Sequence, residues 1–189
     1  MDRRVKYTKM VLKNALVELL SENSIAKITV KAICEKADVN RSTFYTHYTD
    51  QYDLLQNLKD ELFDSINAYI TSHNFREKDE DLYLITYNVM LYIKDNQKIC
   101  TLLFGENGDI KFQKRVFSIL ESPFYNGFNI VLGERKTEYV FSYVISGSLG
   151  LIQSWFKNNL EESPEEIAML ITNLASSGMK LNNITKLKI

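Results

Sequence analysis

Apolar side chains recur every three or four positions along most of the chain, which is the spacing of an amphipathic α-helix. Val11 and Ala15 show this spacing near the N-terminus, and Ile167 and Ile171 show it near the C-terminus. The pattern predicts helices at about residues 6–22, 30–37, 41–48, 51–71, 82–95, 97–104, 110–120, 138–158 and from 164 onwards. We therefore expect an all-α fold of about nine helices.

Residues that break helices are scarce. The chain has only 7 glycines and 2 prolines, and no glycine precedes Gly105. This scarcity disfavours β-sandwiches, β-barrels and glycine-rich phosphate loops. Residues 139–156 carry no charge, but they include four serines and a glutamine. We therefore expect a buried helix there rather than a membrane span.

Residues 29–55 have the outline of a helix-turn-helix, whose second helix can enter the major groove of DNA. A helical projection places Phe44 and Tyr48 on the side that would anchor this second helix to the first. The opposite side is small, hydroxyl-bearing and uncharged, and it lies between Arg41 and His47. Spacing alone leaves a second interpretation open, namely a helical hairpin whose polar face is merely solvated.

Charge is distributed unevenly along the chain. Residues 1–48 hold nine Lys or Arg against five Asp or Glu, a net of +4, and the other 141 residues carry a net of −5. A basic nucleic-acid-binding head on an acidic body would give this distribution, although four charges is a modest excess.

The sequence TVKAICEKADVNRSTFYTHY, residues 29–48, strongly resembles the DNA-binding motif of the TetR family of bacterial regulators. The resemblance extends over about residues 5–70. A second stretch, residues 147–155 followed by Ser-Pro-Glu-Glu at 163–166, resembles the C-terminal domain of one TetR branch. That branch includes activators of dihydroxyacetone-kinase operons.

The resemblance implies a DNA-binding domain at residues 1–48 and a helical effector-binding and dimerisation domain at residues 49–189. It implies that the second helix of the motif contacts DNA through Arg41, Ser42, Thr43, Tyr45, Thr46 and His47. The implied phosphate contacts at the start of the preceding helix are Thr29, Val30 and Lys31. Cations common in the family are replaced here by Thr46, Thr49 and Gln51, so we expect weaker DNA affinity and weaker salt dependence than in a typical relative.

A narrow seam of mostly small residues runs along the apolar helix expected at residues 138–158, at a 4-3-4 spacing: Tyr143, Gly147, Gly150 and Ser154. Such a seam lets another helix approach closely, either within one subunit or from a partner. The family resemblance favours a homodimer interface that contains Gly147, Gly150, Ser154, Leu170, Ile171 and Leu174.

Aromatic residues are plentiful, with 11 Tyr, 10 Phe and 1 Trp. The side chains that could line an apolar pocket are Tyr83, Tyr87, Met90, Phe104, Phe112, Phe117, Tyr143 and Trp155. Aromatic residues at helical spacing also form ordinary cores, so both interpretations stay open. The ligand expected in such a pocket is a small apolar or aromatic effector, and the alternative is a protein co-regulator.

No catalytic or metal-binding pattern stands out. The histidines, His47 and His73, lie in no cluster with metal-ligand spacing. The two cysteines, Cys34 and Cys100, are too few for a disulfide framework, so the cytoplasm is the expected location. We expect no enzyme activity, no cofactor and no membrane association.

The resemblance, taken with these patterns, implies an effector-responsive repressor that binds a palindromic operator as a homodimer. The alternative is an activator or a helical interaction protein that works through a protein partner and binds small molecules weakly or not at all.

Overall fold

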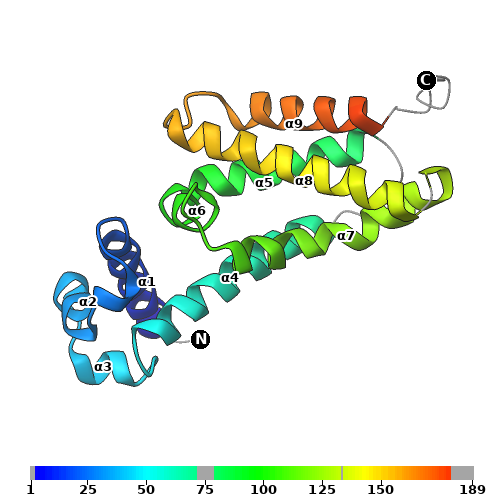
Figure 1. Cartoon of the computed structure of the whole chain (residues 1–189). Coiled ribbons are helices and arrows are strands. Elements are labelled where there is room, and N and C mark those ends of the chain that lie inside the picture. Colours follow the sequence, from blue (N-terminus) through cyan, green and yellow to red (C-terminus); the bar gives the residue numbers. More distant parts are fainter. Residues whose placement is uncertain (1–2, 72–78, 133, 180–189) are drawn as a thin grey trace. The chain divides into compact units, whose positions relative to one another are not determined.

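The computed structural model describes residues 3–71, 79–132 and 134–179, and this part of the chain is almost wholly helical (Figure 1). Its nine α-helices are α1 (Arg3–Leu20), α2 (Val30–Ala37), α3 (Arg41–Tyr45), α4 (Gln51–Thr71), α5 (Asp79–Asp95), α6 (Gln97–Phe104), α7 (Ile110–Leu132), α8 (Glu134–Lys157) and α9 (Pro164–Met179). A short 3₁₀ helix, η1 (Ile25–Lys27), joins α1 to α2. The all-α fold predicted from periodicity is confirmed.

Some helices are longer than the periodicity predicts. α7 continues through Pro123 to Leu132, whereas the proline suggested an end near residue 120. A proline removes one backbone N–H but leaves the hydrogen bonds of the flanking turns in place, so a long helix can pass through it. α8 begins at Glu134 rather than at residue 138, because the charged residues there are good helix formers even though they add no apolar periodicity.

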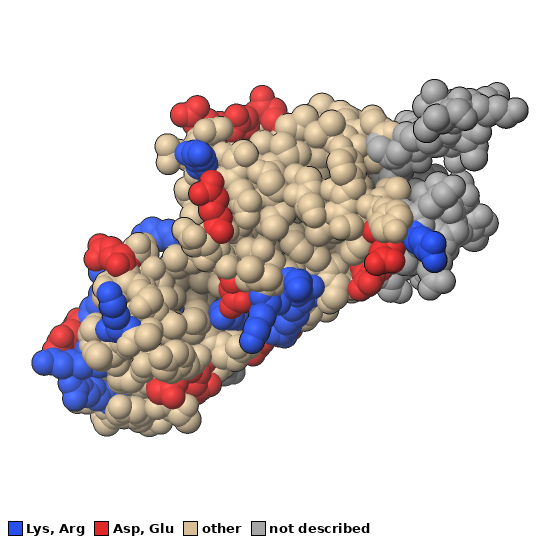
Figure 2. All heavy atoms as spheres, in the orientation of Figure 1, with Lys and Arg blue, Asp and Glu red and all other residues tan. Residues whose placement is uncertain are grey.

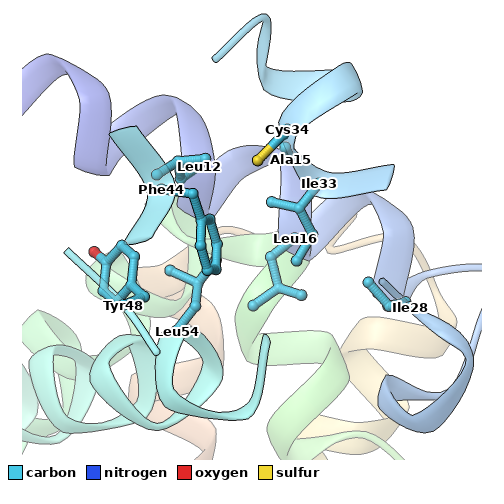
Figure 3. Close-up of a cluster of buried hydrophobic side chains, with 9 residues drawn as sticks. All are labelled: Leu12, Ala15, Leu16, Ile28, Ile33, Cys34, Phe44, Tyr48 and Leu54. Atoms are coloured by element: carbon cyan, nitrogen blue, oxygen red, sulfur yellow. The ribbon is translucent and has the colours of Figure 1, made fainter. Parts of the chain in front are cut away.

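The chain forms two compact units, residues 1–64 and residues 65–189. The first unit, which we call the head, contains α1, η1, α2, α3 and most of α4. Its core is a cluster of nine buried side chains (Figure 3): Leu12, Ala15, Leu16, Ile28, Ile33, Cys34, Phe44, Tyr48 and Leu54. The expected division of function after residue 48 stays a prediction.

In the second unit, which we call the body, α5 packs along α9, α7 packs along α8, and α6 contacts both α7 and α8. Two side chains connect these elements. The Gln153 amide on α8 donates to the carbonyl of Phe104 at 3.1 Å, and the Trp155 indole N–H donates to the carbonyl of Glu162 at 3.0 Å. No helix in the described part of the chain is long and apolar enough to cross a membrane.

Candidate nucleic-acid interface

Side-chain hydrogen bonds define the ends of the two short helices of the motif. At the start of α2, the Thr29 hydroxyl oxygen accepts from the N–H of Ala32 at 3.2 Å. At the start of α3, the Asn40 carbonyl oxygen Oδ1 accepts from the N–H of Ser42 at 3.0 Å. Between them Asp38 ends α2 in the left-handed conformation, with φ 53°. The chain thus leaves one helix and enters the next within three residues, as a helix-turn-helix requires.

Two aromatic rings anchor the second helix of the motif, which ends at Tyr45 rather than at residue 48: Phe44 lies on α3, and Tyr48 lies just beyond its end. Phe44 is fully buried and Tyr48 is 3% exposed, with their ring centroids 5.7 Å apart. Both rings belong to the core cluster, where Figure 3 shows Phe44 between Tyr48 and the side chains from α1. The anchoring role predicted for these two residues is confirmed.

The outer side of α3 is open to solvent. The predicted DNA contacts that lie exposed there are Arg41, Ser42, Tyr45 and Thr46. Thr43 and His47 are half-buried. Tyr45 is 59% exposed, and its ring packs at 85° against that of Phe44. One edge of the ring is therefore held in place while the rest can meet a partner.

The start of α2 presents the predicted phosphate contacts. Thr29 and Lys31 are exposed and Val30 is half-buried. A hollow of about 320 Å³ beside the turn is lined by both Lys31 and Arg41. The structure therefore brings the two predicted cationic contacts to one surface. The same hollow is lined by Glu35 and Asp38, whose carboxylates the sequence analysis did not single out.

The positive charge of the head is partly neutralised by its own glutamates. Ion pairs in the described part of the head include Lys13–Glu61, Lys31–Glu35 and Lys36–Glu18. The Lys36 ammonium donates to the Glu18 carboxylate at 2.8 Å, and this hydrogen bond raises the pKa of Lys36. Figure 2 shows the result, since blue and red side chains are intermixed over the part that contains α1, α2 and α3. The spacing of Lys31 and Glu35, four residues apart on a helix, is the sequence signal that could have found this pairing.

Two titratable groups lie within the core of the head. Burial raises the pKa of the Cys34 thiol, which keeps it protonated and unreactive. Burial also raises the pKa of Tyr48 to about 12, with smaller contributions from Glu61 and Asp53. The Tyr48 hydroxyl has no hydrogen-bond partner in the described part of the chain.

An exposed uncharged face runs along α8 and α9. The predicted interface residues Gly147, Gly150 and Ser154 are exposed on α8, and Figure 2 shows a broad area without Lys, Arg, Asp or Glu over α8 and α9. Leu170 and Leu174 on α9 are 44% and 50% exposed. A Cβ added at Gly147 or Gly150 would meet no atom within 4 Å, so nothing in this subunit requires glycine there.

Two residues lie elsewhere than the sequence analysis placed them. Ile171 is 8% exposed and packs inside the body rather than on the exposed face of α9. Tyr143, assigned to the pocket, is 68% exposed on α8. Tyr139 has a similar exposure one turn earlier, so the helix expected to be buried has one open side.

The other predicted pocket residues are mostly interior. Phe104 packs edge-to-face against Phe112 and Phe117, at centroid distances of 5.6 and 6.4 Å. Met90 and Trp155 are almost fully buried. Tyr83 and Tyr87 stack on each other on α5 and are half-buried. The structure thus brings three of the predicted pocket phenylalanines together, and it pairs the two tyrosines of α5 with each other.

Two family models match the chain. The model of the N-terminal domain of bacterial regulatory proteins of the tetR family matches residues 13–58. A model of a transcriptional regulator C-terminal region, also of the TetR type, matches residues 80–177, which is more than half of the chain. The chain belongs to the TetR family.

Individual proteins show the same TetR likeness. The uncharacterized HTH-type transcriptional regulator YxbF of Bacillus subtilis strain 168 is 27% identical over 172 residues, which are 88% of this chain and 44% of YxbF. The chain therefore spans less than half the length of this curated relative. A TetR transcriptional regulator from Streptococcus agalactiae 2603V has a TM-score of 0.62 and 26% identity, with 92% of this chain and 96% of that chain covered.

The dihydroxyacetone kinase operon activator DhaS has a TM-score of 0.61 and 17% identity, with 92% of this chain and 97% of that chain covered. At this identity the likeness concerns the fold. TetR membership, expected from the sequence, is confirmed, and DhaS is among the structural neighbours. TetR proteins are transcriptional regulators rather than enzymes, in agreement with the expected class.

Proposed function

We propose that this TetR protein is a dimeric transcriptional regulator that binds a near-palindromic operator through α3. The observation that carries the proposal is the exposed outer side of α3, where hydroxyl groups and Tyr45 stand on a helix anchored by Phe44 and Tyr48. Hydroxyl and phenol groups bind both phosphate oxygens and base edges, and Arg41 can bind guanine with two hydrogen bonds. Thr29, Val30 and Lys31 would position the head on the phosphate backbone.

A homodimer would present two heads to successive major grooves about 34–36 Å apart. The exposed face of α8 and α9 supports dimerisation, because glycines and a serine leave room for a second helix beside exposed Leu170 and Leu174. An apolar or aromatic effector bound in the body would shift the separation of the heads and release the operator. The cluster of Phe104, Phe112 and Phe117 supports this part of the proposal. Because it acts on DNA, the protein would work in the cytoplasm, where we expect it to be a repressor. The alternative is an activator that works with a protein partner.

The test is a titration against labelled DNA from the region upstream of the protein's own gene, beside a scrambled duplex, at two salt concentrations. Specific regulators prefer their operator by about a thousandfold or more. Thr43→Ala and Tyr45→Ala should each weaken operator binding by about fivefold or more without lowering the melting temperature. Thr101→Ala, an exposed threonine of α6, is the control and should change nothing. Equal binding of both duplexes by the wild type, or unchanged operator affinity in both α3 variants, would contradict the proposal.

A further inference from the structure

The head holds one of its predicted phosphate contacts in an ion pair. The Lys31 ammonium lies 3.7 Å from a carboxylate oxygen of Glu35, one turn further along α2. Both side chains are exposed, at 64% and 66%. Lys31 and Glu35 also line the hollow beside the turn, together with Asp38 and Arg41. The cations at this surface are therefore matched by an equal number of carboxylates.

Helix stability does not explain this pair. Lys31 is the second residue of the eight-residue α2, and Glu35 lies in its last turn. The helix dipole favours negative charge at the start of a helix and positive charge at its end, so each residue stands at the less favourable end. A Lys–Glu pair in this order is also the weaker of the two i,i+4 orientations, and exposed ion pairs add little to stability. We therefore ask how Glu35 affects the binding of DNA by Lys31.

A DNA phosphate at the start of α2 would need Lys31. The first N–H groups of a helix have no acceptor within it and favour an anion, and the Lys31 ammonium would add the positive charge. The Glu35 carboxylate competes with the phosphate for that ammonium. Phosphate binding thus requires the Lys31 side chain to leave Glu35.

We propose that Glu35 is a positioning residue that sets the DNA affinity of the head by occupying Lys31. The inference rests on the proposed function, because Lys31 matters in this way only if the head binds DNA. Phosphate contacts supply affinity that does not depend on sequence, whereas the exposed side of α3 supplies base contacts. The ion pair with Glu35 weakens the attraction of Lys31 to the phosphates of any DNA. Retention on DNA then depends more on the base contacts of α3.

The experiment measures fluorescence anisotropy of the full-length chain with the upstream and scrambled duplexes, from 50 to 200 mM KCl. Glu35→Gln should tighten binding to both duplexes by about fivefold at the lowest salt. It should also steepen the slope of log affinity against log salt by up to about 1, the change expected for one added phosphate contact. The matched control is Glu18→Gln. It removes the same charge and also frees a lysine, Lys36, which is not among the predicted DNA contacts. Circular dichroism checks that each variant is folded.

A double-mutant cycle tests the route through Lys31. In a Lys31→Met background, Glu35→Gln should no longer tighten binding. A gain that persists in that background means that Glu35 acts by its own charge, and a gain no larger than that of Glu18→Gln means that only net charge matters. Either result overturns the proposal.

If the proposed function is wrong, the experiment gives a different result from the one that overturns the role of Glu35. Wild type that binds both duplexes equally argues against an operator, and the contrast between Glu35→Gln and Glu18→Gln on the scrambled duplex still decides the role of Glu35. If neither the wild type nor Glu35→Gln binds either duplex, both ideas are wrong.

Discussion

Asp38 shows how a single backbone angle shapes the DNA-binding motif. Its φ of 53° and ψ of 47° lie in the left-handed region, which aspartate tolerates and β-branched residues do not. Asp38→Gly should leave the free energy of unfolding within about 0.5 kcal/mol of the wild type, and Asp38→Val should lower it by about 1–2 kcal/mol. Urea titration measures both. Asn14, which is exposed within the right-handed helix α1, is the control. There Asn14→Gly should lower the free energy of unfolding more than Asn14→Val. The same order at both positions would contradict this account.

Tyr48 gives a second prediction at the residue scale. Its hydroxyl is buried without a partner, so Tyr48→Phe should stabilise the chain by about 1 kcal/mol at pH 7. Burial raises the pKa of Tyr48 to about 12 from an ordinary 10, so the phenol of the unfolded chain loses its proton before that of the folded chain. The wild type should therefore keep its full stability below pH 10 and lose stability as pH rises towards 12. The advantage of the phenylalanine variant should therefore widen between pH 9 and pH 11.5 in thermal melts. A difference that stays constant over this range would argue against a protonated buried phenol.

At the scale of elements, reciprocal hydrogen bonds between Ser163 and Glu166 determine where α9 begins. The Ser163 hydroxyl oxygen accepts from the Glu166 N–H at 3.2 Å, and the Glu166 carboxylate accepts from the Ser163 N–H at 2.8 Å. The Ser163 N–H and the Ser163 hydroxyl both donate to the Glu166 carboxylate, and these two bonds lower the pKa of Glu166. Their stabilising effect is therefore present at neutral pH and is lost as pH falls below 4.5. Glu166→Gln should flatten the fall in melting temperature between pH 5 and pH 3. Glu165→Gln, one residue earlier in the same turn, is the control, and an equal effect there would contradict the capping role.

At the scale of the whole molecule, dimerisation can be separated from folding at Gly147. A side chain there meets nothing in its own subunit, and leucine is a better helix former than glycine by nearly 1 kcal/mol. Gly147→Leu should therefore keep the subunit folded and weaken the dimer, with Gly147→Ala intermediate. Sedimentation at several protein concentrations measures the dimer fraction, and circular dichroism measures the fold. Glu121→Leu, exposed on α7, is the control, and a native-sized dimer of Gly147→Leu would show that α8 is not the interface.

The sequence by itself determined the elements of this protein and the motif they form. Helical periodicity, scarce glycine and the caps at Thr29 and Ser163 are local properties, because a helix makes its backbone hydrogen bonds within four residues. The same locality explains why Phe44 and Tyr48 were assigned correctly to the buried side of the motif, although α3 ends before Tyr48. Local rules failed at Pro123, because a proline discourages a helix without determining where a long one ends.

Tertiary structure alone decided which surfaces are covered. Tyr143 and Ile171 have the same apolar character in sequence, yet packing of α8 and α9 leaves the tyrosine exposed and buries the isoleucine. Packing likewise showed that Gly147 and Gly150 face open space, and it brought Lys31 and Arg41 to one hollow with two carboxylates. Burial depends on residues that are distant in the chain, and a linear pattern does not record which of them pack together.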